Sequence, residues 1–253
     1  MLTNPWFYAA ALPIVFLVGL SKGGFLTGLG LLGVPLLSLV VPPSAAAGIL
    51  LPVLLGMDAV AVWSYRNSFD RKHLMVLLPT ALIGTAIGWF TASWITETHF
   101  RIILGVIGIV FLLQALFLKA RAMEMKPAGS VLSIILCVSA GFTSFISHAG
   151  GPLAQIYLQP QKLPPAIFAG TIVMCFAALN LIKVGPFLSL NLINASSLMA
   201  SLTLLPMAVI ASYCGVWLAK RVPQQPFYLI ANICLAIVSV ELVRSGIVKV
   251  MAG

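Results

Sequence analysis

Charged side chains are scarce in this sequence of 253 residues: 8% are Asp, Glu, Lys or Arg, whereas 61% are hydrophobic. A soluble globular domain carries about 25% charged residues. The 14 basic and 5 acidic side chains present here cannot cover a surface that faces water. The mean hydropathy of +1.11 is typical of a chain whose solvent is mostly lipid. The composition therefore predicts a polytopic membrane protein whose main partner is the lipid bilayer.

Cysteine pairs and common catalytic motifs are also missing. The sequence has no CxxC, HExxH, GxSxG or P-loop pattern, so we expect no disulfide framework, no metal, no cofactor and no enzymatic activity. A membrane enzyme assembled from Ser147, His148 and Asp58 is the outside alternative. The cysteines lie far apart in apolar runs, and we interpret them as small core residues. They are Cys137, Cys175, Cys214 and Cys234.

The sequence contains no basic stripe and no basic leader. Its net charge of +9 comes from residues spread along the chain, which argues against nucleic acid as a partner and is typical of loop charges that set membrane topology. No basic residue precedes Lys22, so we expect no cleaved signal peptide.

Long apolar runs dominate what is present. Six of them are about 20 residues long, which at 1.5 Å per residue spans a hydrocarbon core of roughly 30 Å. These predicted transmembrane helices cover residues 44–65, 73–95, 100–119, 165–186, 196–219 and 226–248. Two further apolar regions, 6–42 and 127–158, are too long for one simple crossing and contain Gly and polar residues near the middle. We predict that each forms a broken pair of helices.

The two halves of the chain resemble each other in the order of their Pro and Gly residues. Leu77–Pro79 corresponds to Leu204–Pro206, and Gly33–Leu36 corresponds to Gly150–Leu153. This ordered agreement predicts an internal duplication, with repeats at residues 1–126 and 127–253.

The distribution of basic residues predicts that the second repeat is inverted. Lys and Arg are held on the cytoplasmic side, and the loops 96–99 and 184–195 contain neither. With those loops outside, the two broken regions become re-entrant hairpins that enter from opposite faces, and both termini lie outside. The basic residues then predicted inside are Arg66, Arg71, Lys72, Lys119, Arg121, Lys126, Lys162, Lys220 and Arg221. Those predicted outside are Arg101, Lys183, Arg244 and Lys249, with Lys22 in the membrane.

Broken helices in inverted repeats are where secondary transporters hold their substrates. The free N–H groups at a half-helix start favour an anion, and Lys22 adds a positive charge, so we predict an anion site between the hairpin tips. Lys22 could instead snorkel to the interface, His148 could hydrogen-bond a neighbouring helix, and the hydroxyl groups could bond their own helices. The predicted substrate-binding residues are Ser21, Lys22, Gly23, Gly24 and Thr27 at the first break, and Ser144, Ser147, His148, Gly150 and Gly151 at the second.

A buried carboxylate accompanies this site. Asp58 and its counterpart in the second repeat, Asn180, place polar groups within predicted crossings, where they are costly. We expect either pairing of Asp58 with Lys22, proton coupling, or a structural hydrogen bond, and we assign Asp58 and Asn180 to coupling or to support of the binding residues. Near the outer interface we expect two pairs at i, i+3 or i, i+4 spacing, which are Glu241 with Arg244 and Glu97 with Arg101.

The glycine-rich segments also resemble those of a known family. Gly19–Phe25, Gly30–Leu37 and Pro42–Gly48 in the first half, with His148–Leu153 and Phe168–Thr171 in the second, are similar to the motifs of the sulfite exporter family TauE/SafE. The resemblance extends over nearly the whole chain. It implies export of sulfite, sulfoacetate or another small organosulfonate across a bacterial inner membrane.

Together these observations predict an all-α polytopic membrane protein, with two inverted-topology repeats that each contain a re-entrant helical hairpin and three transmembrane helices. It would move a small anion by alternating access, as a probable exporter. A carrier of another carboxylate or inorganic anion is the alternative. An ion channel is less favoured because few polar residues line the crossings. Import, a coupling ion and a homo-oligomer remain open.

Overall fold

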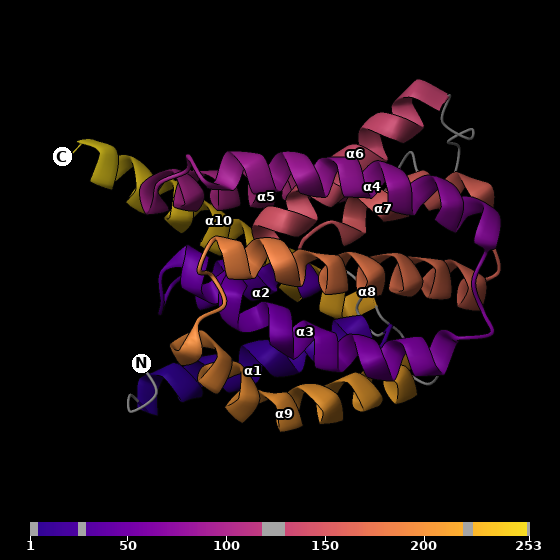
Figure 1. Cartoon of the computed structure of the whole chain (residues 1–253), viewed down its shortest axis with the longest axis horizontal. Coiled ribbons are helices and arrows are strands. Elements are labelled where there is room, and N and C mark those ends of the chain that lie inside the picture. The colour runs from indigo at the N-terminus through magenta and orange to yellow at the C-terminus, as the bar shows by residue number, and fades with distance from the viewer. Residues whose placement is uncertain (1–4, 25–28, 118–129, 220–224, 252–253) are drawn as a thin grey trace.

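The computed structural model describes residues 5–24, 29–117, 130–219 and 225–251. This part of the chain contains ten α-helices, two short 3-10 segments and no strand (Figure 1). The first half comprises α1 (Pro5–Lys22), η1 (Leu29–Leu32), α2 (Gly33–Leu37), α3 (Pro43–Tyr65), α4 (Arg71–Ala92) and α5 (Glu97–Phe117). The second comprises α6 (Ser130–Ser147), α7 (Gly151–Leu158), η2 (Gln159–Gln161), α8 (Pro165–Ser189), α9 (Ala195–Ala219) and α10 (Gln225–Met251). The predicted all-α class is confirmed.

Several helices begin where local chemistry favours a start. Helices α3 and α8 each begin at the second residue of a Pro-Pro pair, at Pro43 and Pro165. Proline suits the first helical turn because the N–H that it lacks has no partner there. Asp70 caps α4 by accepting a hydrogen bond from the backbone N–H of His73 at 2.9 Å.

The length and surface of the helices are those of a multi-pass membrane protein. Among the described residues, α1, α3, α4, α8 and Ala195–Leu218 of α9 are long and apolar enough to cross a membrane. Exposed tryptophans lie near the ends of these helices: Trp6 and Trp94 at one end of the molecule, Trp63 and Trp217 at the other. Such aromatic side chains prefer the two membrane interfaces. Their positions match helices that cross the bilayer.

Helices α3 and α8 occupy the middle of the molecule. They pack against each other, with α1 and α9 on one side and α4 and α6 on the other (Figure 1). Helices α5 and α10 form a further pair. Close approach of α4 and α6 depends on Gly84 and Gly141, because a Cβ atom at either position would overlap the facing backbone, at Val138 and Ala81 respectively.

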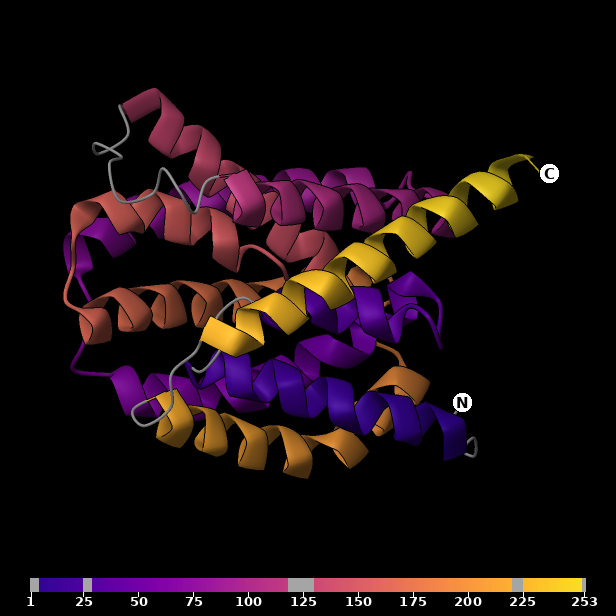
Figure 2. The same ribbon diagram turned by 180° about the vertical axis from the view of Figure 1, so that it is seen from behind.

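Two helices end inside the molecule rather than in a surface loop. Helix α1 ends at Lys22, where Gly24 has a φ of 96°, and α6 ends at Ser147, where His148 has a φ of 54°. A short helix follows each break, α2 after the first and α7 after the second. Helices α1 and α6 begin at opposite ends of the molecule, whereas α1 begins and α10 ends at the same end (Figure 2).

One sequence-based assignment is wrong. The segment 184–195 was expected to be an outer loop with Lys183 beside it, but α8 continues to Ser189 and Lys183 is fully buried. The loop is therefore limited to residues 190–194. Several basic residues used to predict the topology, namely Lys119, Arg121, Lys126, Lys220 and Arg221, lie outside the described residues.

Candidate functional site

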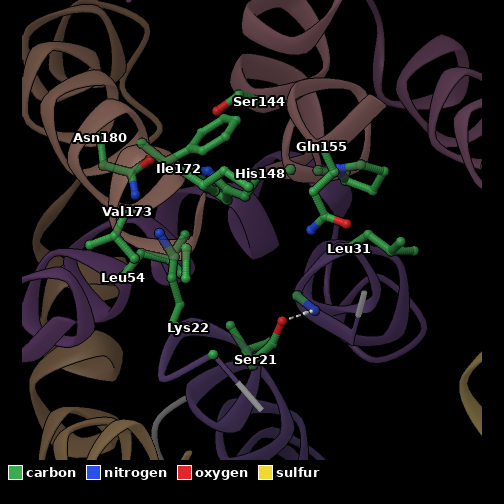
Figure 3. Close-up of a pocket in the computed structure, with 18 of the residues that line it drawn as sticks. Ser21, Lys22, Leu31, Leu54, Ser144, His148, Gln155, Ile172, Val173 and Asn180 are labelled. Carbon is green, nitrogen blue, oxygen red and sulfur yellow. Dashed lines mark hydrogen bonds between the residues drawn. The ribbon is translucent and has the colours of Figure 1, made fainter. Parts of the chain in front are cut away.

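A cavity of about 110 Å³ lies between the two breaks and the central helices (Figure 3). Since a water molecule needs roughly 10–15 Å³ of such volume, the cavity has room for several waters or one small ligand. The first half of the chain contributes Val18, Ser21, Lys22, Gly24, Gly30, Leu31 and Leu54 to the lining. The second half contributes Ser144, His148, Ala149, Gly151, Pro152, Gln155, Phe168, Ala169, Ile172, Val173, Phe176 and Asn180.

Most of the predicted site residues meet at this cavity. Those in its lining are Ser21, Lys22, Gly24, Ser144, His148, Gly151 and Asn180. Ser21 also accepts a hydrogen bond from the backbone N–H of Gly30 at 2.9 Å, which joins α1 to the segment after the first break. The structure thus brings together residues from both breaks that are more than a hundred positions apart in the sequence.

Other predicted site residues are not in the cavity lining. Gly23 packs against the α9 backbone at Ser212, and Gly150 packs against the carbonyl of Ala140, so both are sites of close helix approach. Ser147 is buried and donates a hydrogen bond to the carbonyl of Thr143 within α6. These residues lie near a break in the sequence, but the two glycines serve helix packing and Ser147 bonds its own helix. Thr27 lies outside the described residues.

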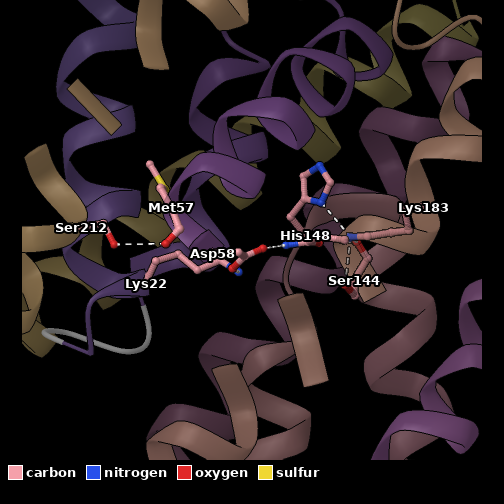
Figure 4. Close-up of polar contacts among 8 residues, drawn as sticks. Lys22, Met57, Asp58, Ser144, His148, Lys183 and Ser212 are labelled. Atoms are coloured by element: carbon pink, nitrogen blue, oxygen red, sulfur yellow. Dashed lines mark hydrogen bonds and ion pairs between the residues drawn. The ribbon is translucent and has the colours of Figure 1, made fainter. Parts of the chain in front are cut away.

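Lys22, which is partly buried, and Asp58, which is buried, form an ion pair beside the cavity (Figure 4). The Nζ atom of Lys22 lies 2.6 Å from Oδ1 of Asp58, and the side-chain amide of Asn180 donates to Oδ2, also at 2.6 Å. The predicted pairing of Asp58 with Lys22 is confirmed. Lys22 does not snorkel to the interface, because its ammonium contacts a carboxylate on a central helix. These contacts join α1, α3 and α8 at the depth of the first break.

Lys183 of α8 contacts the residues at the second break, where α6 ends. Its Nζ atom donates to the carbonyl of Ser144 at 2.9 Å, to the Ser144 hydroxyl at 3.1 Å and to Nδ1 of His148 at 3.0 Å. Lys183 is 0% exposed. It is therefore a fully buried lysine that holds the end of α6, instead of the outer-loop residue that the charge pattern suggested.

His148 connects the second break to α3 as well as to α8. Its Nε2 atom lies 3.1 Å from the carbonyl of Ala47, and its Nδ1 atom faces Lys183. A neutral ring with its proton on Nε2 satisfies both contacts, since the ammonium of Lys183 can only donate. This arrangement matches the interpretation of His148 as a residue that hydrogen-bonds neighbouring helices.

The two ion pairs expected on α5 and α10 behave differently. Glu241 and Arg244 form the predicted i, i+3 pair at 2.7 Å. The expected pair of Glu97 with Arg101 is not formed: Glu97 accepts a hydrogen bond from Ser44, and Arg101 donates to the carbonyl of Ser38 at 3.1 Å. Glu97 thus attaches α5 to the first turn of α3, and Arg101 attaches it to the C-cap of α2.

Within the described residues, no three His, Cys, Asp or Glu side chains come close enough to hold a metal ion. The cysteines there are free thiols, with Cys137 and Cys175 buried and Cys214 partly buried. The polar groups of the cavity region therefore consist of lysines, one carboxylate, one histidine, hydroxyls and amides, a set suited to binding a small anion.

The sequence reasoning missed Lys183 and Gln155. The signal for Lys183 was present, because a lysine inside the apolar stretch of α8 is rare and usually functional. It also follows Asn180 by three positions, about one helical turn. It was missed because Lys183, although inside the predicted crossing 165–186, was counted with the outer loop 184–195 that overlaps the end of that crossing.

Comparison with known proteins adds to this geometry. The sequence matches the family described as sulfite exporter TauE/SafE over residues 11–242, a range that includes both breaks and the cavity. No curated protein and no solved structure matched the chain. Its family consists of membrane transporters, in agreement with the apolar helices and the cavity. The chain belongs to the sulfite exporter TauE/SafE family.

Proposed function

We propose that this protein is a secondary transporter that exports a small sulfur-containing anion, such as sulfite, sulfoacetate or another organosulfonate, across a bacterial inner membrane. The observation that carries the proposal is the charge around the cavity. The partly buried Lys22 and the fully buried Lys183 lie at the two breaks, and Asp58 is the only buried carboxylate in the described part of the chain. The excess positive charge favours an anion, and the family supports sulfur.

Transport by alternating access is supported by the arrangement of the broken helices. Helices α1 and α6 begin at opposite ends of the molecule and both end at the cavity. This is the arrangement expected of two inverted repeats, 1–126 and 127–253, each with a re-entrant hairpin. Single cysteines at Asn67 and Asn191 test it, because labelling reagents should reach Asn67→Cys only from inside and Asn191→Cys only from outside. Labelling of both from the same side would overturn the inverted topology.

The cavity extends along one part of α8 only. Its α8 residues run from Phe168 to Asn180, whereas Lys183 and Phe187 further along the helix are fully buried. Phe187 packs edge to face on Phe145 of α6, with 5.2 Å between ring centroids. We propose that these contacts close the outer end of the site in this conformation and separate when the transporter opens outward.

Export of an anion requires no coupled proton. In a cell with a negative interior, an anion moving outward gains about 2.3 kcal/mol per charge per 100 mV. Asp58 is held by Lys22 and Asn180, so its role in the proposed transporter is to support the site. Coupling to an ion remains the competing proposal for Asp58.

Equilibrium binding to the purified protein tests the substrate class. We expect sulfite and sulfoacetate to bind and to displace each other, and loaded proteoliposomes to release them faster than protein-free vesicles. Binding of acetate without any sulfur-containing anion would instead indicate a carboxylate carrier. Binding of none of these anions would overturn the proposal.

A further inference from the structure

We infer that Lys183, and not Lys22, supplies the positive charge that compensates the bound anion, and that it does so through the hydroxyl group of Ser144. This inference rests on the proposed function, because it assigns the charge of the same anion site. It differs from the sequence-based expectation, which gave that role to Lys22.

The first step is that Lys22 is already neutralised. Its ammonium lies 2.6 Å from a carboxylate oxygen of Asp58, which is 4% exposed. The second carboxylate oxygen accepts from Asn180. An ion pair at this distance has little net charge to offer a ligand, and separating it inside the membrane would leave a costly buried charge.

The second step is that Lys183 has no such partner. In the described part of the chain, ion pairs within 4.0 Å involve Lys22 and Arg244 but not Lys183. Lys183 instead donates to three neutral acceptors, two on Ser144 and one on His148. A fully buried lysine without a counter-ion is unfavourable in its charged form. An anion in the adjacent cavity would favour the ammonium over the neutral amine.

The third step concerns which group touches the anion. Lys183 is not in the cavity lining, whereas Ser144 and His148 are. Both ring nitrogens of His148 are engaged, by Ala47 and by Lys183. The Ser144 hydroxyl accepts from Lys183 and keeps its own hydrogen for another acceptor. A hydroxyl that accepts from a cation is a stronger donor, so Ser144 transmits the charge of Lys183 to the anion. Lys183 is therefore a positioning residue and Ser144 the contact.

Binding of sulfoacetate to two charge variants distinguishes the lysines. Lys183→Met removes the unpaired cation, and the double variant Lys22→Met with Asp58→Asn removes the ion pair without changing the net charge. We expect Lys183→Met to weaken binding at least ~30-fold, the size of a lost charged hydrogen bond, and the double variant to weaken it several-fold less. An equal or larger loss in the double variant would overturn the inference.

The charge of the ligand provides a readout that a purely structural role would not change. Sulfoacetate carries a sulfonate and a carboxylate, whereas taurine carries a sulfonate and an ammonium group and has no net charge. If Lys183 acts by its charge, Lys183→Met should weaken sulfoacetate binding more than taurine binding. An equal loss for both ligands would indicate only local unfolding and would overturn the inference.

Ser144→Ala tests the contact without removing a charge. Its matched control is Ser201→Ala, since Ser201 is equally buried and donates to the Ile49 carbonyl on α3, away from the cavity. We expect Ser144→Ala to weaken sulfoacetate binding about tenfold and Ser201→Ala to leave it unchanged. In the Lys183→Met background, Ser144→Ala should add little. Equal losses in the two serine variants, or additive losses with Lys183→Met, would contradict the relay.

Failure of this inference can be separated from failure of the proposed function. If the wild-type protein binds none of sulfite, sulfoacetate and taurine, the proposed function is wrong and the inference falls with it. If the wild-type protein binds sulfoacetate and folded Lys183→Met binds it equally well, only the assignment of the charge is wrong. Thermal unfolding in detergent shows which variants are folded.

Discussion

The two breaks that border the cavity are built from similar residues but are held in different ways. The break after α1 carries its own lysine, Lys22, and pairs it with Asp58 from α3. The break after α6 carries no charged residue, and Lys183 reaches it from α8. The lysine at the first break is therefore neutralised by a carboxylate. The lysine at the second break has no acidic partner within 4.0 Å among the described residues. The comparison teaches that a similar glycine-rich sequence at each break does not imply similar chemistry.

The largest expected effect comes from removing the lysine of the Lys22–Asp58 ion pair. Lys22→Met should destabilise the protein by about 3–5 kcal/mol, because it leaves the buried carboxylate of Asp58 without a cation. Adding Asp58→Asn should restore most of the loss. The midpoint of thermal unfolding in detergent measures both effects. If Lys22→Met unfolded at the wild-type temperature, the first break would not depend on its ion pair, and the comparison would fail.

A smaller effect is expected when His148 is changed. His148→Gln should cost about 1–3 kcal/mol, because the carbonyl of Ala47 and the ammonium of Lys183 each lose a buried partner. If the role of His148 is structural, the surviving transport should depend on the pH gradient as the wild type does. Gradient-driven flux and counterflow in proteoliposomes measure this dependence. Loss of gradient-driven flux with intact counterflow would instead assign proton coupling to His148.

The glycines at the breaks sharpen the comparison further. Gly23→Ala should cost about 1–3 kcal/mol, because its Cβ would overlap the α9 backbone at Ser212 and Val216. Gly151→Ala should leave stability nearly unchanged, since nothing lies within 4 Å of its Cβ. Gly151 lines the cavity, so its added methyl should reduce substrate binding instead. Unfolding and binding measurements on both variants provide the check. The opposite pattern would show that the cavity residues were assigned wrongly.

The smallest effect is expected far from both breaks. Arg244→Ala removes an exposed ion pair with Glu241 in the C-terminal part of α10. Exposed pairs of this kind contribute little, so both the unfolding midpoint and sulfoacetate binding should match those of the wild type. A clear loss of binding would mean that charges outside the cavity region influence the site. The difference between the two breaks could then not be attributed to their own charged residues.

The sequence by itself determined the class of the protein. Apolar runs with few charges permit little else than membrane-crossing helices, since backbone groups in lipid must be hydrogen-bonded within the helix. The interrupted runs also indicated where the two breaks lie, because Gly and polar residues persist in the membrane only where protein or a cavity satisfies them. Most of the predicted site residues line the cavity for that reason.

The sequence offered pairing with Lys22 as one of three roles for Asp58, and only the tertiary structure decided which charges are paired. Lys22 and Asp58 are 36 positions apart, and Lys183 lies 39 positions from Ser144. Their contacts depend on how α1, α3, α6 and α8 pack, and the sequence pattern holds no information on these distances. The same holds for Gly23 and Gly150, which lie near the breaks in sequence but pack against helix backbone, and for Ser147, which bonds its own helix. Whether a buried charge in the membrane is paired depends on the groups within a few ångströms of it, and helix packing sets those distances.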